Sequence, residues 1–348
     1  MKILIVKLSA IGDVIHTLPA LNALRRHHPK SHITWLVEEA AASLVQGHRA
    51  LDRVLVSRRK HWLRKLKKPG RAKSLLEIRD FIRALRDTRY DLIIDFQALL
   101  KSSVLIALAK GRRKVGFGRG LAHMEGSYLF LNERIPAVNM EIHALDRGLM
   151  LLEAMGVPRG KLTYDLPVET ADRRAVNVLL DRFGIDASKP LVAINPVAKW
   201  KTKLWPPGKF ARLADQLIDH CGVQVVFTGS TQDRATVSGI LAHMRFPAVS
   251  LAGETSLKTL AALYQRCRLL ISTDTGPMHL GCAAAIPVVA LFGPTAPGRT
   301  GPYGKQHRIV RTGVACSPCF KRICPIGTGE CMGLLATRQV FNAVARFL

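Results

Sequence analysis

Short, largely apolar runs alternate with helix-like segments along the first 100 residues of the chain. The apolar runs lie at residues 3–6, 33–37, 53–56 and 92–95. Segments with helical spacing lie between them, at residues 18–26, 40–46 and 79–89. A continuous apolar run is typical of a strand buried on both faces, and strands that alternate with helices form parallel sheets. The pattern therefore predicts an α/β domain.

The same alternation restarts in the second half, after a polar, proline-containing stretch near residues 160–190 that we interpret as a linker. The later apolar runs lie at residues 191–194, 223–227, 248–251, 269–272 and 288–292, and the helical segments at 208–220, 234–242, 256–266 and 278–285. We predict two doubly wound, Rossmann-like domains, at residues 1–165 and 185–335, followed by a closing helix at 336–348.

The 348-residue chain is strongly basic, with 52 lysines and arginines against 25 acidic residues and a net charge of +27. Such a surface attracts nucleic acid, an anionic membrane face or a phosphorylated substrate. Aromatic residues make up only 6% of the chain, and it has no zinc-finger spacing, RNP-like segment or basic zipper. Nucleic acid is therefore the least favoured of the three partners. No apolar run reaches the ~18 residues needed to span a bilayer.

The cysteines bear on both location and metal binding. There are seven, an odd number, and the apolar run that ends at Lys7 is shorter than a signal-peptide core. We therefore expect a reduced, cytoplasmic protein. Four cysteines cluster as C-x2-C-x4-C-x6-C, and four thiolates can close a structural zinc site. The spacing matches no standard zinc ribbon or finger, which favours reduced cysteines in a loop. The four are Cys316, Cys319, Cys324 and Cys331.

Three loops that follow predicted strands carry candidate chemistry, because ligands of doubly wound sheets bind beyond the carboxyl ends of the strands. Asp13 follows Gly12 in the first such loop, where it either faces a ligand or caps the next helix. Asp274 precedes a helix that opens near Pro277, whose N-terminus suits a diphosphate. Lys203 can offset charge on a phosphate leaving group or belong to a solvated basic loop.

In this order, these segments resemble the family 9 glycosyltransferases, the ADP-heptose:lipopolysaccharide heptosyltransferases. The strongest marks are K-L-S-A-I-G-D-V-I-H-T-L-P at residues 7–19, S-T-D-T-G-P-M-H-L at 272–280 and L-F-G-P-T at 291–295. The resemblance covers nearly the whole chain. The N-terminal half looks most like heptosyltransferase I, through W-L-V-E-E at 35–39 and D-F-Q-A-L-L-K-S at 95–102. The cysteine-containing tail looks more like the heptosyltransferase II relatives.

The resemblance implies a GT-B fold with two Rossmann-like domains facing across a cleft. It implies inverting transfer of heptose from ADP-L-glycero-D-manno-heptose to the inner-core Kdo of Kdo-lipid A, with no required cofactor. By the same match, Asp13 is the base, Lys203 stabilises the leaving group and Asp274 binds the sugar. The donor contacts that we expect from the match are Asp274, Thr275, Gly276, His279, Asn195 and Thr255. One departure is Val197-Ala198, where the family usually has a polar pair.

The basic run at residues 57–73 holds nine lysines and arginines and no acidic residue. Most such runs are solvated, mobile loops. This run follows a predicted strand at the acceptor side and contains Trp62, a residue suited to a membrane interface. The predicted acceptor contacts are Arg59, Lys60, Arg64, Gln97 and Lys101. The residues predicted to lie against anionic lipid are Lys65, Lys67 and Lys68.

Three alternatives to this hypothesis stay open. They are a family 9 transferase of the heptosyltransferase II type or with another core acceptor, a nucleotide-sugar epimerase on a similar two-domain fold, and a basic nucleic-acid-binding protein. Only the main hypothesis predicts that Kdo-lipid A gains a heptose while ADP is released. It also implies a peripheral position on the inner face of the cytoplasmic membrane, because lipid A phosphates, Kdo carboxylates and the leaflet itself are anionic.

Overall fold

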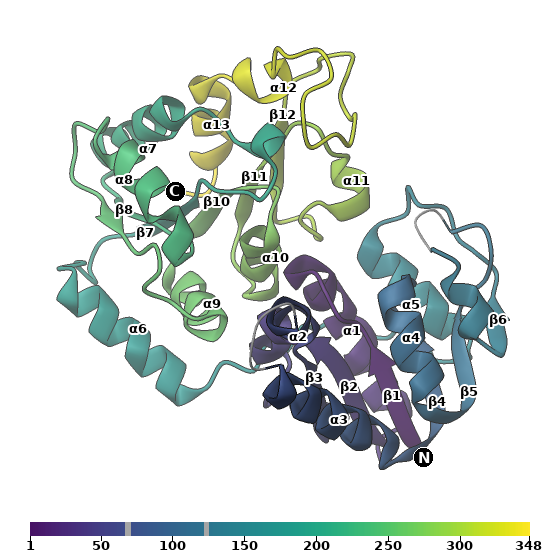
Figure 1. The fold of residues 1–348 in the computed structure, drawn as a ribbon. Coiled ribbons are helices and arrows are strands. Elements are labelled where there is room, and N and C mark those ends of the chain that lie inside the picture. The colour runs from purple at the N-terminus through teal and green to yellow at the C-terminus, as the bar shows by residue number, and fades with distance from the viewer. Residues whose placement is uncertain (67–70, 122–124) are drawn as a thin grey trace. The chain divides into compact units, whose positions relative to one another are not determined.

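The computed structural model describes residues 1–66, 71–121 and 125–348 and consists of two compact units, Met1–Pro167 and Val168–Leu348 (Figure 1). Each unit is built on a six-stranded sheet whose paired strands are all parallel. The predicted α/β class is therefore confirmed.

The first unit has the strand order β3-β2-β1-β4-β5-β6. Its strands are β1 (Lys2–Val6), β2 (His32–Glu38), β3 (Arg53–Ser57), β4 (Arg89–Asp95), β5 (Lys110–Phe117) and β6 (Glu133–Ile135). Its described helices are α1 (Ile11–His27), η1 (Glu39–Leu44), α2 (Arg59–Lys65), α3 (Ala72–Arg86), α4 (Leu100–Leu108), η2 (Ser127–Phe130) and α5 (Ala144–Glu153), where η marks a 3₁₀ helix.

The second unit has the strand order β12-β11-β10-β7-β8-β9. Its strands are β7 (Leu191–Asn195), β8 (Gln224–Phe227), β9 (Val249–Ser250), β10 (Leu269–Thr273), β11 (Val288–Phe292) and β12 (Arg308–Arg311). Its helices are α6 (Thr170–Arg182), η3 (Lys201–Lys203), α7 (Pro207–Cys221), η4 (Thr231–Asp233), α8 (Arg234–Leu241), α9 (Leu257–Arg266), α10 (Gly276–Ala283), α11 (Pro297–Thr300), α12 (Glu330–Gly333) and α13 (Thr337–Val344).

Both sheets have the same doubly wound order when each is numbered from its own first strand. The order reverses between β1 and β4 in the first unit and between β7 and β10 in the second. Chains that leave such neighbouring strands diverge to opposite faces of the sheet and leave a crevice at the carboxyl ends, where ligands of this fold bind. The crevice of each unit is therefore the place to look for a site.

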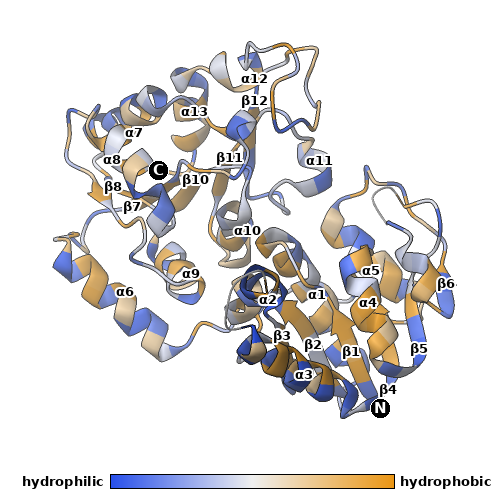
Figure 2. Ribbon diagram, viewed as in Figure 1, coloured by the Kyte–Doolittle hydropathy of each residue, from blue (hydrophilic) through white to orange (hydrophobic). Residues whose placement is uncertain are grey.

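The central strands form the core because they are apolar on both faces. Ile3, Leu4, Ile5 and Val6 of β1 have no solvent exposure, and Figure 2 shows β1 and β2 in the colours of hydrophobic residues. Burying each such side chain contributes about 1.5–3 kcal/mol relative to leaving it exposed. These rigid strands fix the position of every loop that leaves their carboxyl ends.

Two expectations about the elements were wrong. The stretch near residues 160–190 is not a simple linker, because it contains the amphipathic helix α6, which buries Val176, Leu179 and Leu180 and packs against α9. The first helix begins at Ile11 rather than near residue 18, with Pro19 inside it, so Asp13 lies within the helix itself.

Candidate functional site

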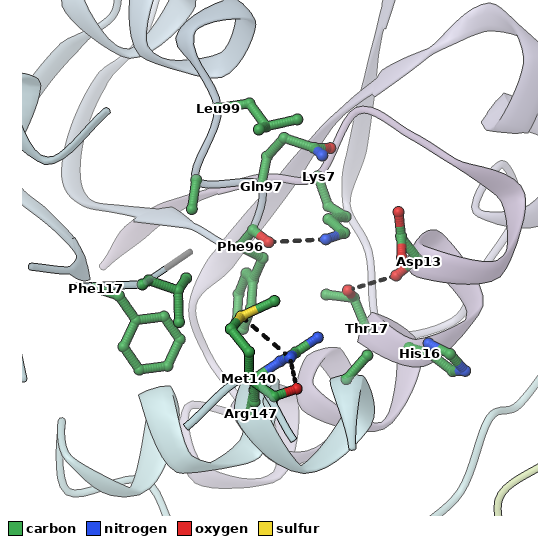
Figure 3. Close-up of a pocket in the computed structure, with 14 residues that line it drawn as sticks. Lys7, Asp13, His16, Thr17, Phe96, Gln97, Leu99, Phe117, Met140 and Arg147 are labelled. Carbon is green, nitrogen blue, oxygen red and sulfur yellow. Dashed lines mark hydrogen bonds between the residues drawn. The ribbon is translucent and has the colours of Figure 1, made fainter. Parts of the chain in front are cut away.

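Asp13 lies in the first turn of α1, directly after the loop that leaves β1. The backbone N–H of Ala10 donates to Asp13 Oδ2 at 2.9 Å, and the Thr17 hydroxyl donates to the Asp13 carbonyl oxygen at 2.8 Å. The side chain also lines a pocket of about 300 Å³, together with Lys7 and Arg147 (Figure 3). Asp13 therefore supports the helix N-terminus and faces a pocket at the same time, which joins the two interpretations of its position in the sequence.

The bottom of this pocket is set by the register of β1 and β4. Val6 pairs with Asp95, so the chain leaves both strands side by side, and Lys7 Nζ donates to the carbonyl oxygen of Phe96 at 2.9 Å. Burial lowers the pKa of Lys7, against the opposing effect of the Asp13 and Asp95 carboxylates. Burial also raises the pKa of Asp95 to about 6. The pocket thus combines the desolvated ammonium of Lys7 with apolar lining residues such as Phe96 and Phe117.

Gln97, a predicted acceptor contact, holds the loop that carries Asp13. Its Oε1 accepts the backbone N–H groups of Leu8 and Ser9 at 2.9 and 3.0 Å. The same side chain lines the Asp13 pocket. Its amide carbonyl therefore fixes the β1–α1 loop, while its position also brings it to any ligand in the pocket.

Three cations meet at one buried carboxylate, which we call the Glu38 cluster. Glu38 ends β2, and its side chain is only 4% exposed. Arg59 Nη2 and Lys101 Nζ lie 3.3 and 3.7 Å from Glu38 Oε1, and Lys60 Nζ lies 3.5 Å from Oε2. Lys101 Nζ also contacts the hydroxyl of Ser9, in the loop that leads to Asp13. One carboxylate offsets only one of three positive charges, so the cluster favours an anionic ligand.

The electrostatics of Lys101 reflect this crowding. Burial lowers the pKa of the Lys101 ammonium, the Arg59 and Lys60 charges lower it further, and Glu38 opposes them. An anion bound at the cluster would relieve this unfavourable field. Sequence patterns did not identify Glu38, although an acidic residue at the end of a buried strand is a signal that could have found it.

The basic run is folded in its described part, and the expectation of a membrane-facing Trp62 was wrong. Trp62 is only 7% exposed, because α2 packs its indole against Phe81 of α3, with ring centroids 5.2 Å apart. The indole Nε1–H donates to Glu77 Oε2 at 2.9 Å. A mobile loop is likewise excluded for α2. A buried and hydrogen-bonded indole cannot serve as an interface anchor.

The other predicted contacts of the run, those expected to bind the acceptor or lipid, separate into two groups. Arg64 and Lys65 are exposed on α2, and among the described residues Arg64 does not join the Glu38 cluster. Lys67 and Lys68 lie outside the described residues. The structure therefore brings Arg59, Lys60 and Lys101 together as predicted for one site, without Arg64.

The second unit places Lys203 and Asp274 in direct contact. Asp274 follows β10, and its Oδ2 accepts from Lys203 Nζ at 2.6 Å and from the hydroxyl of Thr295 at 2.6 Å. The two charged side chains are 15% and 6% exposed. Three loops, after β7, β10 and β11, thus meet at one carboxylate. Thr295, in the L-F-G-P-T segment, had no assigned role in the sequence pattern.

The loop that presents Lys203 is held by aromatic contacts. Lys203 Nζ lies 4.6 Å from the centre of the Trp200 ring, a cation–π distance. Trp205 is buried, stacks edge-on against Phe210 with centroids 4.9 Å apart, and donates from Nε1 to Leu335 O at 3.0 Å. These anchors keep the ammonium at a defined position.

The other predicted donor contacts differ in their surroundings. Thr275 and Gly276 begin α10, whose free N–H groups and dipole attract anions. His279 is buried in the same helix. Asn195 is fully buried and donates to Thr228, so its side chain joins strand ends rather than facing solvent. Thr255 belongs to the loop before α9, apart from the Asp274 contacts.

The four tail cysteines line one small pocket, and Cys331 is the buried member. Burial and the neighbouring thiols raise the pKa of Cys331. Backbone N–H groups, with that of Gly329 3.4 Å from Sγ, lower the pKa of Cys324. In the described part of the chain, no group of three or more His, Cys, Asp or Glu side chains is arranged to hold a metal ion.

None of the helices in the described residues is long and apolar enough to cross a membrane.

Comparisons with known proteins give consistent results. The family profile described as Glycosyltransferase family 9 (heptosyltransferase) matches residues 78–328. Lipopolysaccharide heptosyltransferase 1 of Pseudomonas aeruginosa is 32% identical over 331 residues, which cover 93% of this chain and 87% of that protein. Lipopolysaccharide heptosyltransferase 2 of Escherichia coli K12 is 29% identical and covers 89% and 88% of the two chains. The structure of E. coli heptosyltransferase WaaC with ADP matches with a TM-score of 0.80 and 26% identity over 100% of both chains.

Proposed function

The chain belongs to glycosyltransferase family 9, the heptosyltransferases, and from this premise we propose that it transfers heptose from ADP-L-glycero-D-manno-heptose to the inner-core Kdo of Kdo-lipid A. Its motifs predicted the family, and that prediction is confirmed, as is the GT-B class of its two doubly wound units. It is a glycosyltransferase, whereas the precise donor and acceptor are proposals.

The observation that carries the acceptor proposal is the surplus of positive charge beside Asp13. Arg59, Lys60 and Lys101 share one buried carboxylate, and Lys101 reaches Ser9 in the loop that positions Asp13. Kdo carries a carboxylate and lipid A carries phosphates. Arg59 can bind either group in a bidentate manner, while the two lysines act as point charges. An acceptor held there presents its sugar hydroxyl toward the pocket of Asp13.

We assign the chemistry to a single displacement. The acceptor hydroxyl oxygen forms a bond to the anomeric carbon of the heptose while its proton passes to Asp13. The bond from that carbon to the β-phosphate oxygen breaks, and ADP leaves with the electron pair. Attack opposite the leaving group inverts the anomeric centre. Lys203 offsets the charge that grows on the β-phosphate.

The donor is assigned to the crevice between β7 and β10. The N-terminus of α10 suits the diphosphate, because its first N–H groups have no partner within the helix. Asp274 holds Lys203 through Oδ2, and we assign its Oδ1 to a hydroxyl of the heptose. The carboxylate would otherwise repel the diphosphate, and the ammonium at 2.6 Å offsets that repulsion.

We further propose that the enzyme acts at the inner face of the cytoplasmic membrane as a peripheral protein. The support is the net charge of +27 together with the exposed Arg64 and Lys65 on α2. Each exposed basic residue near an anionic leaflet contributes about 1 kcal/mol at low ionic strength. Binding to vesicles that contain anionic lipid should then fall steeply with added salt.

The test is incubation with ADP-heptose and deacylated Kdo-lipid A, followed by mass spectrometry. We expect the acceptor mass to rise by one heptose residue with release of an equal amount of ADP. An epimerase would change the donor and leave the acceptor mass unaltered, and a nucleic-acid-binding protein would change neither. Either result would refute the proposal.

A second candidate is a heptosyltransferase II-type reaction, in which the acceptor already carries one heptose. It is favoured by the 29% identity to the E. coli heptosyltransferase 2 and by the cysteine-containing tail. Offering the enzyme both acceptors in one reaction separates the two candidates. Preferential extension of the already heptosylated acceptor would replace the first proposal by the second.

For the tail, we propose that the four cysteines remain reduced thiols without a structural zinc ion. Metal analysis of the purified protein should then give well under one zinc or iron per chain, and one metal per chain would refute this. Because backbone N–H groups lower the pKa of Cys324 while burial raises that of Cys331, Cys324 should be alkylated first near neutral pH. Peptide mass spectrometry after short iodoacetamide treatment measures the order.

A further inference from the structure

A large apolar groove lies between α2, α3 and α4 of the first unit, apart from the Asp13 pocket. Its volume is about 580 Å³. Buried Trp62, Phe81 and Leu105 belong to its lining. The more exposed apolar lining residues are Leu63, Leu66, Ile78, Ile82, Leu100, Val104 and Leu108. Figure 2 shows apolar residues on both α3 and α4. We call this feature the α2–α4 groove.

The lining of this groove is unusually exposed for large apolar side chains. Leu63, Leu100 and Val104 are 51%, 49% and 48% exposed, and they come from α2 and from the first half of α4. Single exposed apolar residues are ordinary on a protein surface. A contiguous set around one concave feature marks a binding surface. The groove is therefore shaped and lined for an apolar ligand.

Two cations of the Glu38 cluster border this groove. Arg59 and Lys101 line the groove and also approach Glu38, at 3.3 and 3.7 Å. Lys101 in turn contacts Ser9, in the loop that carries Asp13. Glu125 also lines the groove, where its carboxylate accepts the backbone N–H of Leu100 at 3.2 Å. The surface thus runs from the Asp13 carboxylate through cations to apolar side chains.

A ligand that complements this surface has a hydroxyl-bearing sugar, then anionic groups, then a hydrocarbon chain. We propose that the α2–α4 groove binds an acyl chain of the acceptor glycolipid, so that one molecule contacts Asp13, the Glu38 cluster and the groove together. The inference rests on the proposed function for the identity of the acceptor. The match of charge order, and the continuity of the groove with the acceptor cations, favour this occupant over a second protein chain.

A binding experiment tests the groove without any catalytic reaction. The probes are dodecyl phosphate, butyl phosphate and 12-bromododecyl phosphate, used below their micelle-forming concentrations. We expect saturable binding of dodecyl phosphate, at least tenfold weaker binding of butyl phosphate, and quenching of tryptophan fluorescence by the brominated chain. The quenching should disappear in Trp62→Phe, because Trp62 belongs to the groove lining. Equal affinity for the short and long chains would mean an anion site only and would overturn the proposal.

Two polar substitutions at exposed groove positions provide the matched variant, Leu63→Asn with Val104→Asn. Both positions are about half exposed, so the fold should tolerate the change. Each methylene that a chain buries is worth up to about fourfold in affinity. The double variant should therefore weaken dodecyl phosphate binding about tenfold. Val178→Asn on α6, a position 67% exposed and outside the groove, is the control and should bind like the parent.

Kinetics then connect the groove to the acceptor. We expect the double variant to raise the KM for acylated Kdo-lipid A about tenfold relative to the KM for its deacylated form. Leu76→Asn, on an exposed part of α3 that does not line the groove, should leave this ratio within twofold of the parent. An equal change in Leu76→Asn would mean that this face lies on hydrocarbon in general and would overturn the proposal. If the parent enzyme extends neither acceptor, the proposed function fails, while the dodecyl phosphate result still decides the groove.

Discussion

Asp13 has an observed structural contact and a proposed catalytic role, and one substitution can separate the two. The carboxylate accepts the Ala10 N–H at 2.9 Å, which supports the start of α1, and the proposed reaction also gives it the acceptor proton. Asp13→Asn keeps an amide oxygen that can accept the same N–H but cannot take up a proton at neutral pH. Asp13→Ala removes both functions.

The expected magnitudes follow from these contacts. A positioned base contributes about 100-fold to 10,000-fold to turnover, or about 3–5 kcal/mol of barrier. Loss of the charge near a helix N-terminus costs about 0.3–1 kcal/mol of stability. Loss of the Ala10 hydrogen bond in the alanine variant adds about 1 kcal/mol. Both variants should therefore lose turnover to a similar degree, whereas only Asp13→Ala should lose substantial stability.

The assay combines kcat at saturating donor with urea unfolding of the same preparations. Donor KM should stay close to that of the parent, because Asp13 belongs to the first unit and the proposed donor site to the second. Turnover of Asp13→Asn within about threefold of the parent would refute the role as base. If stability fell in Asp13→Ala while turnover held in Asp13→Asn, Asp13 would be a capping residue only.

Lys203→Ala should lower kcat more than it raises the donor KM, because the β-phosphate charge grows during transfer. Asp274→Ala should lower kcat and raise the donor KM. The Lys203→Ala/Asp274→Ala double variant should lose much less activity than the two single losses combined, because the two groups act as a pair at 2.6 Å. Additive losses would contradict the coupling. Arg59→Ala should raise the acceptor KM at least tenfold with the donor KM unchanged, whereas Arg64→Ala should change it less than threefold; equal effects would exclude a specific cluster. Burial raises the pKa of Asp95 to about 6, so the folded state keeps a proton that the unfolded chain releases near pH 4. The free energy of unfolding should then fall by up to about 3 kcal/mol as pH rises from 4 to 6, and Asp95→Asn should reduce this pH dependence. If urea unfolding of Asp95→Asn gave the same dependence on pH as the parent, the raised pKa of Asp95 would be refuted.

The strands and their order along the chain could be predicted because parallel strands buried on both faces read as continuous apolar runs. The polar residues that follow those runs then had to lie at the carboxyl edge of a sheet. This logic identified Asp13, Lys203 and Asp274 as site candidates, and the structure places the last two in contact. It could not specify that contact, because strand order within a sheet is a tertiary property.

Strand β5 was missed because its composition resembles that of a surface segment. Strand β5 begins with Lys110 and contains three more basic residues, yet it pairs with β4 and β6 through its backbone. Glu38 was missed because its three cations come from two distant segments, one around Arg59 and one at Lys101. Trp62 was misjudged because its burial depends on α3 packing against α2, which local charge does not reveal.

The hydrogen bonds also explain why Asp13 rather than Asp274 is assigned as the base. Asp274 Oδ2 already accepts from an ammonium and a hydroxyl, each at 2.6 Å, so a proton from the acceptor cannot be passed to that oxygen without breaking one of them. Asp13 accepts a single backbone N–H and has no ion pair within 4 Å among the described residues. Asp13, the carboxylate that takes up a proton in the proposed mechanism, is thus held by the weaker contact. In the proposed mechanism the carboxylate that holds a cation in place, Asp274, has the stronger contacts, so we assign acid–base chemistry to the crevice of the first unit and charge stabilisation to that of the second.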